Sequence, residues 1–224
     1  MSFNGGKDCL VMLILFLAGL SRYYRKQALQ HSTATSIPLS TPPPNSNSTT
    51  CPPSPPSKPT TIPCVYVMST HPFPEVDHFV SACVPTYHLT VHRYPVPMKH
   101  AFSTYLSQHP PVKAIFVGTR RTDPHGATLT SFDRTDRGWP DFVRIHPVVE
   151  WHYREIWAFL RELRIPYCEL YDMGYTSLGG TTDTHPNPKL AVAVRDGESG
   201  KREGGFRPAY ELMEDEEERL GRDR

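Results

Sequence analysis

The apolar and polar positions of this chain follow two periods, and each period predicts a different secondary structure. Apolar residues at helical spacing predict helices over residues 73–84, 98–108 and 153–163. Short apolar or alternating runs predict strands over residues 64–68, 89–94, 113–117 and 142–149. Near the N-terminus, residues 10–20 form an unbroken apolar run, which predicts one further helix, buried and too short to span a bilayer.

The predicted strands and helices alternate along the chain, and this order favours one architecture. Parallel pairing with right-handed crossovers gives an α/β fold with a doubly wound, mostly parallel sheet, whose ligands bind at the carboxyl ends of the strands. We expect a single domain over residues 1–224. A tract at about 33–63 is rich in Pro, Ser and Thr and should be a disordered insertion, with a proline-rich partner motif as the alternative.

The segment before the first apolar run has the features of a phosphate-binding loop. Residues 2–8 are mostly polar, and they open directly into the helix, whose first N–H groups lack partners within the helix and point at an anion. Gly5 and Gly6 let a phosphate approach the backbone, and Lys7 adds a mobile positive charge. One alternative is a Gly-Gly turn before a buried helix. Another is a secretory signal peptide, although no small-residue cleavage pattern follows the run.

The position of this loop at the N-terminus is unusual for the predicted fold. A phosphate loop in a doubly wound sheet follows a buried strand, yet Met1 directly precedes this one. The first strand therefore looks missing, through a fragment or a misplaced start. We expect the chain to be less stable and less active than a form that carries an upstream apolar strand.

Composition limits the classes of function. The 224 residues have a formal net charge of +1, which argues against a general binder of nucleic acid or of membrane surfaces. The five cysteines are scattered without a Cys-x-x-Cys pair, which favours a reducing, intracellular setting over a disulfide scaffold. The eleven histidines show no metal-ligand spacing.

Several later segments, read together with residues 2–9, resemble one known family. Residues 118–124 follow a predicted strand, and residues 134–142 and 170–180 add polar, glycine-containing loops. These segments are similar to those of the eukaryotic, fungal-type FAD synthetases, or FMN adenylyltransferases. That family belongs to the ATP pyrophosphatases with a PAPS reductase-like, adenine nucleotide alpha hydrolase-like fold. The similarity extends to the tail, over residues 208–212 and 218–222.

The resemblance implies a reaction in which AMP passes from ATP to FMN, giving FAD and pyrophosphate with the help of Mg²⁺. The attacking FMN phosphate is already ionised near neutral pH, so no general base is needed, and catalysis reduces to alignment and charge neutralisation. The resemblance implies ATP and FMN as small-molecule substrates. We further expect a cytoplasmic monomer with no nucleic-acid or membrane partner.

The resemblance assigns roles to particular residues on the nucleotide side. Asn4 lies close to the reacting phosphate, and Asp8 acts near the metal, or else it is a first-turn carboxylate that favours the helix dipole. Asp123 orients substrate or Mg²⁺, or else forms a turn before Pro124. Asn4, Asp8 and Asp123 are thus the candidate catalytic residues, and Asp8 or Asp123 the candidate metal ligand. The candidate ATP and pyrophosphate contacts are Ser2, Asn4, Gly5, Gly6, Lys7, Asp8, Gly118 and Arg120.

On the flavin side the resemblance points to two segments. Asp136 would accept a hydrogen bond from the isoalloxazine edge, and Trp139 would pack beside the ring. Arg219 and Arg222, one helical turn apart, would clamp the FMN phosphate. The alternative for both arginines is a charged surface helix in which they pair with neighbouring acids.

Two other functions stay open at this stage. A sulfonucleotide (PAPS) reductase has a similar loop, but it needs a nucleophilic cysteine near the C-terminus, and no cysteine follows Cys168. A catalytically impaired remnant or interaction module is the other alternative, because the first strand looks missing.

Overall fold

The computed structural model describes residues 1–34, 59–192 and 205–223. Its contacts divide the chain into two compact units, Met1–Leu13 with Thr61–Arg224, and Ile14–Thr60. Every candidate site residue belongs to the first unit. Most of the predicted Pro-rich insertion, from 35 to 58, lies outside the described residues.

The strands form two small sheets. β1 (Ile62–Val67) and β2 (Leu89–Tyr94) pair in parallel, with Ile62 opposite Leu89. β3 (Ala114–Phe116) pairs in parallel with β5 (Val143–Ile145), and β4 (Phe132–Arg134) pairs antiparallel with β5. This arrangement confirms the mostly parallel α/β fold. It adds β4, which is not among the predicted strands, and it shortens the last predicted strand to β5.

Residues 1–3 connect the two sheets. Ser2 forms a parallel bridge with Val65 in β1, and its N–H donates to the Phe116 carbonyl at the end of β3 over 2.8 Å. The Phe3 N–H donates to the Val65 carbonyl at 2.9 Å, while the Val65 N–H donates to the Met1 carbonyl at 2.8 Å. These residues therefore take the position between β1 and β3. This corrects the expectation that nothing remains for a first strand, although the segment is only a bridge.

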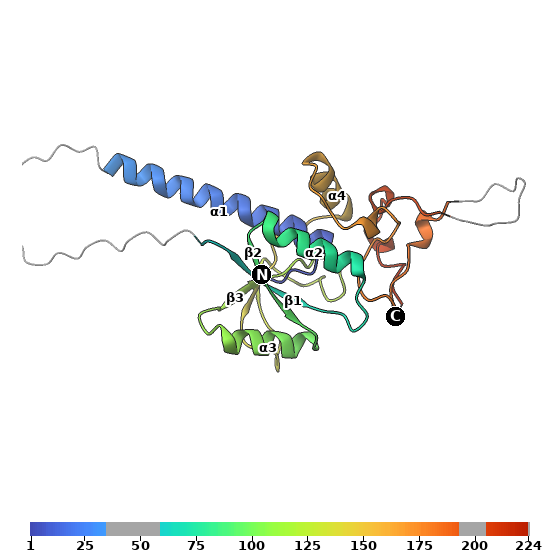
Figure 1. The fold of residues 1–224 in the computed structure, drawn as a ribbon, viewed down its shortest axis with the longest axis horizontal. Coiled ribbons are helices and arrows are strands. Elements are labelled where there is room, and N and C mark those ends of the chain that lie inside the picture. Colours follow the sequence, from blue (N-terminus) through green and yellow to red (C-terminus); the bar gives the residue numbers. More distant parts are fainter. Residues whose placement is uncertain (35–58, 193–204, 224) are drawn as a thin grey trace, which may run out of the picture. The chain divides into compact units, whose positions relative to one another are not determined.

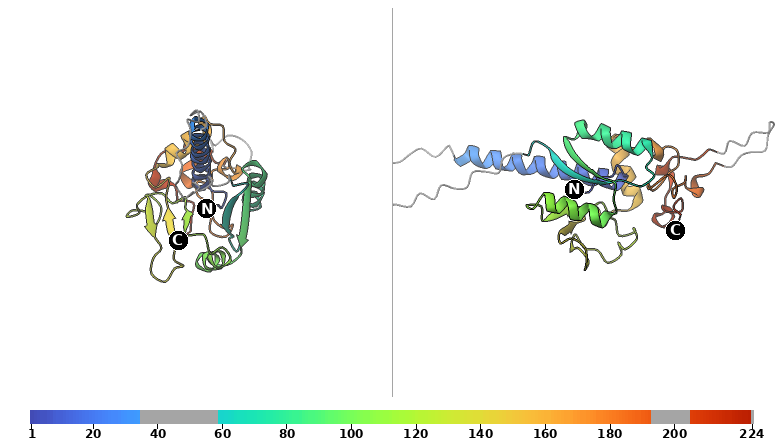
Figure 2. Two further views of the ribbon diagram at one scale, coloured as in Figure 1. Left: turned by 90° about the vertical axis from the view of Figure 1, so that its left-hand side faces the viewer. Right: turned by 60° about the horizontal axis from the view of Figure 1, so that its bottom comes forward.

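Helices cover both faces of the strands. α2 (Pro74–Thr86) and α3 (Met98–Gln108) lie on opposite sides of β1 and β2 (Figures 1 and 2). Proline at the start of α2 suits the first helical turn, which lacks N–H acceptors. Val65, Phe102, Tyr105, Ile115 and Phe142 form a buried cluster between α3 and the sheet. α4 (Tyr153–Glu162) follows β5 and confirms the last predicted helix.

α1 (Lys7–Ala34) begins inside the predicted loop and runs well beyond the apolar segment. Residues 10–13 are fully buried, whereas residues 14–20 are half-buried or exposed. The helix is thus confirmed, but the expected burial of the whole run is wrong. None of the described helices is long and apolar enough to cross a membrane.

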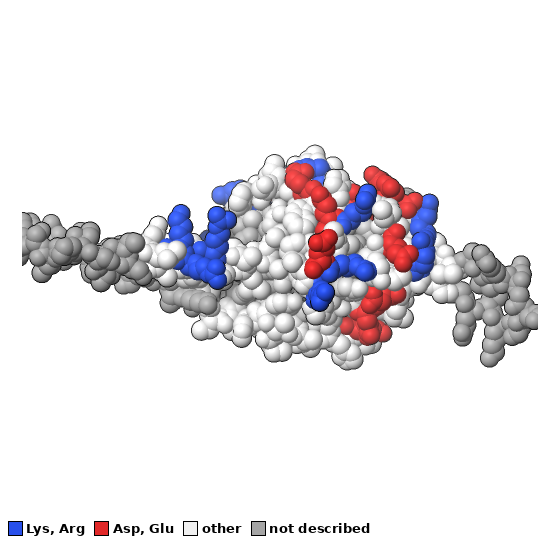
Figure 3. Space-filling model, turned by 90° about the horizontal axis from the view of Figure 1, so that it is seen from above, with Lys and Arg blue, Asp and Glu red and all other residues white. Residues whose placement is uncertain are grey.

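The C-terminal part consists of short 3-10 helices, η1 (Glu169–Tyr171), η2 (Pro188–Leu190), η3 (Ala209–Glu211) and η4 (Asp215–Glu217). The expected charged tail helix around residues 214–222 is therefore wrong. Beyond η4 the chain turns, and Arg222 forms an antiparallel bridge with Thr184. In Figure 3, acidic and basic side chains are interspersed on the right-hand part of the face, while a group of basic side chains at the left has no acidic side chain among them.

Candidate active site

The candidate residues fall into two cavities and one buried cluster of charges. A cavity of about 270 Å³ includes Asn4 and Arg222. A second cavity, of about 230 Å³, includes Ser2, Asp136 and Trp139. The N-terminal segment contributes to both cavities, so the structure brings together the predicted nucleotide and flavin residues from distant parts of the sequence.

The packing and hydrogen bonds of the N-terminal loop bear on why Gly5 and Gly6 are glycines. Gly5 has a φ of +77°, and a Cβ at this position would lie 2.9 Å from the Val80 Cγ2 atom in α2. The Gly6 N–H donates to the Asn4 Oδ1 atom at 3.0 Å. Glycine at position 5 therefore lets the loop pack against α2, a reason that the sequence pattern alone does not provide.

Lys7 is buried, and the expectation of a mobile charge is wrong. Lys7 is 1% exposed. Its Nζ atom lies 3.1 Å from the Asp8 Oδ2 atom and also contacts the Glu218 carboxylate. The ammonium lies 5.0 Å from the centre of the Tyr153 ring, and the backbone N–H donates to the Tyr171 Oη atom at 2.9 Å. Burial alone would lower the pKa of Lys7, but the two carboxylates outweigh it and hold this pKa well above its ordinary value.

Arg120 is likewise enclosed by carboxylates, and its side chain is fully buried. The Nε atom lies 2.7 Å from the Asp8 Oδ1 atom, the Nη1 atom lies 3.1 Å from the Asp215 Oδ1 atom, and the Nη2 atom contacts Glu218. These contacts join the N-terminal loop, the segment after β3 and the C-terminal segment. We call Lys7, Asp8, Arg120, Asp215 and Glu218 the charge cluster.

The segment after β3 is fitted closely to the start of α1. A Cβ at Gly118 would lie 2.9 Å from the backbone nitrogen and from the Sγ atom of Cys9, so only glycine allows this approach. The Asp123 Oδ2 atom accepts a hydrogen bond from the Arg120 N–H at 2.8 Å, and the Asp123 N–H donates to the Arg120 carbonyl at 3.1 Å. This geometry is that of the turn-forming alternative for Asp123.

Two further residues of the second cavity escaped the sequence analysis. Arg144 lies 3.4 Å from the Asp136 carboxylate, and its Nε atom is buried without a hydrogen-bond partner. His146 is 2% exposed, and its Nδ1 atom lies 3.0 Å from the Thr130 carbonyl. Arg144 is the middle residue of β5 and His146 directly follows this strand, near the edge where a doubly wound sheet places its ligands. Asp136 itself is exposed, and Trp139 is 39% exposed.

The two tail arginines, Arg219 and Arg222, lie in different environments in the structure. Arg222 lines the 270 Å³ cavity, and its Nη2 atom lies 3.2 Å from the Asp183 Oδ2 atom. Arg219 is exposed and lines neither of the two cavities. The structure thus brings only one of the two predicted clamp residues to the candidate site.

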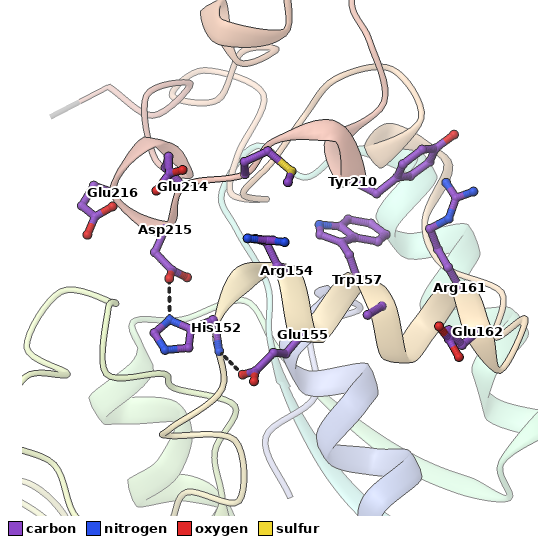
Figure 4. Close-up of a pocket in the computed structure, with 12 residues that line it drawn as sticks. His152, Arg154, Glu155, Trp157, Arg161, Glu162, Tyr210, Glu214, Asp215 and Glu216 are labelled. Carbon is purple, nitrogen blue, oxygen red and sulfur yellow. Dashed lines mark hydrogen bonds and ion pairs between the residues drawn. The ribbon is translucent and has the colours of Figure 1, made fainter.

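A larger cavity, of about 890 Å³, lies beside α4 and holds none of the predicted site residues (Figure 4). Asp215 connects it to the charge cluster, because its other oxygen lies 2.7 Å from the His152 Nδ1 atom. That hydrogen bond and the negative charge of Asp215 raise the pKa of His152 above its ordinary 6.5.

Comparison with known proteins identifies the family. The chain is 40% identical over 222 residues to the probable FAD synthase of Schizosaccharomyces pombe, an alignment that covers 99% of this chain and 70% of that protein. The chain belongs to the FAD synthase family. The probable FAD synthases of two Caenorhabditis species are longer, and the chain covers 36% of each.

Solved structures agree with membership of the FAD synthase family. Candida glabrata FMN adenylyltransferase is 28% identical, and its complex with FMN and the ATP analogue AMPCPP has a TM-score of 0.77, with 99% of this chain and 79% of that one covered. Its complex with FAD and inorganic pyrophosphate has a TM-score of 0.81 and covers 100% and 78%. A model of the phosphoadenosine phosphosulfate reductase domain matches residues 96–186, which confirms the predicted fold relationship.

The buried position of Glu218 gives a stability prediction. Replacing Glu218 with Gln leaves Lys7 and Arg120 with one negative charge fewer in a buried site, and we expect a loss of about 3 to 5 kcal/mol in the free energy of unfolding, measured in urea. The matched control is Glu217→Gln, because the pair of Glu217 with Lys189 is solvent-exposed and its loss should lower the free energy of unfolding far less. Equal losses in the two variants would contradict this reading of the cluster.

The pair of His152 and Asp215 gives a pH prediction. Since the folded-state pKa of His152 is raised, its contribution to stability is present below the ordinary 6.5 and is lost as the pH rises through the raised value. NMR titration of the imidazole should give a midpoint above 6.5 in the unaltered chain and a lower midpoint in Asp215→Asn. Glu211→Gln, a carboxylate paired elsewhere with Arg207, should leave the midpoint in place. If the midpoint is the same in Asp215→Asn as in the unaltered chain, Asp215 is not the cause of the raised pKa of His152.

Proposed function

We propose that this chain is an FMN adenylyltransferase, which makes FAD and pyrophosphate from FMN and ATP. The observation that carries the proposal is its similarity, over its full length, to a structure solved with both products bound. The two cavities, each lined by one residue of the N-terminal segment, support a site for two substrates.

The proposed reaction is a displacement at phosphorus that needs no acid or base. An oxygen of the FMN phosphate forms a bond to the α-phosphorus of ATP, while the bond from that phosphorus to the bridging β-phosphate oxygen breaks. Pyrophosphate leaves with the electron pair, and no proton has to move. The protein therefore has to align two anions and offset their repulsion.

The geometry divides the proposed roles between the two cavities. Asn4 and Arg222 face the cavity where we place the reacting phosphates, and Ser2 faces its neighbour. Asp136 and Trp139 provide a carboxylate and an indole for the flavin ring. We assign Lys7 and Arg120 to the framework instead, because both cations are buried against carboxylates. Substrate contacts stay predictions for four further residues, Gly5, Gly6, Gly118 and Arg219.

We propose that Mg²⁺ is held mainly by the substrate phosphates, because neither predicted ligand, Asp8 or Asp123, lines either cavity. The described residues hold no group of three ligand side chains, and both oxygens of Asp8 contact Lys7 or Arg120. Mg²⁺ commonly takes one or two carboxylates and completes its shell with water and substrate phosphates. Asp8 or Asp123 would supply the carboxylate, and the metal would offset phosphate charge. The cytoplasmic location and monomeric state also remain proposals.

The rival functions find less support. Burial raises the pKa of the Cys168 thiol to about 11, which makes it a poor nucleophile, and no cysteine follows it in the sequence. A non-catalytic role predicts no product at all.

Incubation with ATP, FMN and Mg²⁺, followed by chromatography, tests the function. We expect FAD and pyrophosphate in equal amounts. The reductase alternative requires sulfite from PAPS with a thiol donor, and the non-catalytic alternative requires that neither reaction proceeds. Absence of FAD at saturating substrates would overturn the proposal.

Asp136 provides a test of the flavin cavity. Removing a carboxylate that accepts a hydrogen bond from the flavin edge should raise the KM for FMN about tenfold or more in Asp136→Ala, with little change in the KM for ATP. Asp141→Ala is the matched control, because this neighbouring carboxylate is exposed and pairs with Arg134. Unchanged FMN kinetics would remove Asp136 from the flavin site.

A further inference from the structure

Arg222 needs support if it is to act on a phosphate, because a free arginine side chain loses considerable rotamer entropy when it is fixed. Among the described residues that line the 270 Å³ cavity, it is the only cation. Its Nε atom is buried and has no hydrogen-bond partner. An unsatisfied buried donor is costly, and a phosphate oxygen is a suitable acceptor for it.

Asp183 contacts this guanidinium from the same cavity. The Asp183 Oδ2 atom lies 3.2 Å from the Arg222 Nη2 atom. The Oδ1 atom accepts hydrogen bonds from the Gly180 N–H and the Thr184 hydroxyl, each at 2.9 Å. One oxygen thus fixes the carboxylate on its own loop, and the other is directed at Arg222.

The backbone and a glycine complete the arrangement. Thr184 and Arg222 form an antiparallel bridge, and the Asp223 N–H donates to the Asp183 carbonyl at 3.0 Å. A Cβ at Gly179 would lie 2.3 Å from the Arg222 Cζ atom, so the guanidinium rests directly on this glycine. The side chain is therefore held from one edge and from one face.

We infer that Asp183 and Gly179 are positioning residues, which orient the Arg222 guanidinium toward a substrate phosphate in the cavity shared with Asn4. This inference rests on the proposed function. Neither residue needs to touch substrate. Asp183 fixes the direction of the arginine donors, and Gly179 leaves the space that the guanidinium plane occupies.

A double-mutant cycle tests this inference on the full chain. We expect Asp183→Asn to lower kcat/KM for FMN, at saturating ATP, about tenfold in the unaltered chain and less than about twofold in an Arg222→Ala background. Where turnover is too low, the dissociation constant of FMN from flavin fluorescence completes the cycle. A merely structural effect would be equal in both backgrounds, and this result would overturn the inference.

Gly179→Ala provides a second, uncharged probe. The three atoms nearest to the added methyl group all belong to the Arg222 guanidinium, at the far end of a flexible side chain. We therefore expect the fold to persist, checked by melting temperature, while kcat/KM falls as in Asp183→Asn. Gly19→Ala, whose Cβ meets nothing within 4 Å, and Glu211→Gln are the matched controls and should keep full activity. Full activity in Gly179→Ala would also overturn the inference.

The failure of the proposed function and the failure of this inference give different results. If the unaltered chain makes no FAD, the proposed function fails. If it makes FAD but the effects of Asp183→Asn and Arg222→Ala are additive, only the positioning role of Asp183 is refuted.

Discussion

The charge cluster is the interaction on which the candidate site depends. Lys7 and Arg120 are almost completely excluded from water, and each is tolerable there only because carboxylates from other segments contact it. Glu218 contacts both cations and thereby ties the last residues of the chain to the first. Buried ion pairs add little net stability, but removing one partner is costly, so the cluster mainly fixes a geometry.

That geometry explains how short elements build a site for two substrates. Residues 1–3 bridge β1 and β3, and within this N-terminal segment Ser2 lines the 230 Å³ cavity while Asn4 lines the 270 Å³ cavity. The C-terminal segment has only brief 3-10 helices of its own. Its position is set by Glu218 at one end and by the pairing of Arg222 with residues 183–184 at the other.

Local sequence patterns predicted those features that depend on local forces. The helices α2, α3 and α4 follow from helical periodicity, and the strands β1, β2 and β3 follow from short apolar or alternating runs. β4 was missed, because three residues in a polar stretch pair only through long-range register. The burial of Lys7 was missed for a similar reason. Its partner Glu218 is 211 positions away, and no local pattern connects them.

The same cluster decides which groups can offset the charge of the phosphates. Its two cations face three carboxylates, so it carries no positive charge to spare. The proposed reaction brings two phosphate-bearing substrates together and needs positive charge where they meet. Among the described residues that line the 270 Å³ cavity, where we propose that the phosphates meet, Arg222 is the only cation, and Mg²⁺ bound to ATP would add positive charge. Lys7 and Arg120 therefore stabilise the structure of the site, whereas Arg222 and Mg²⁺ would offset the phosphate charge during the proposed reaction.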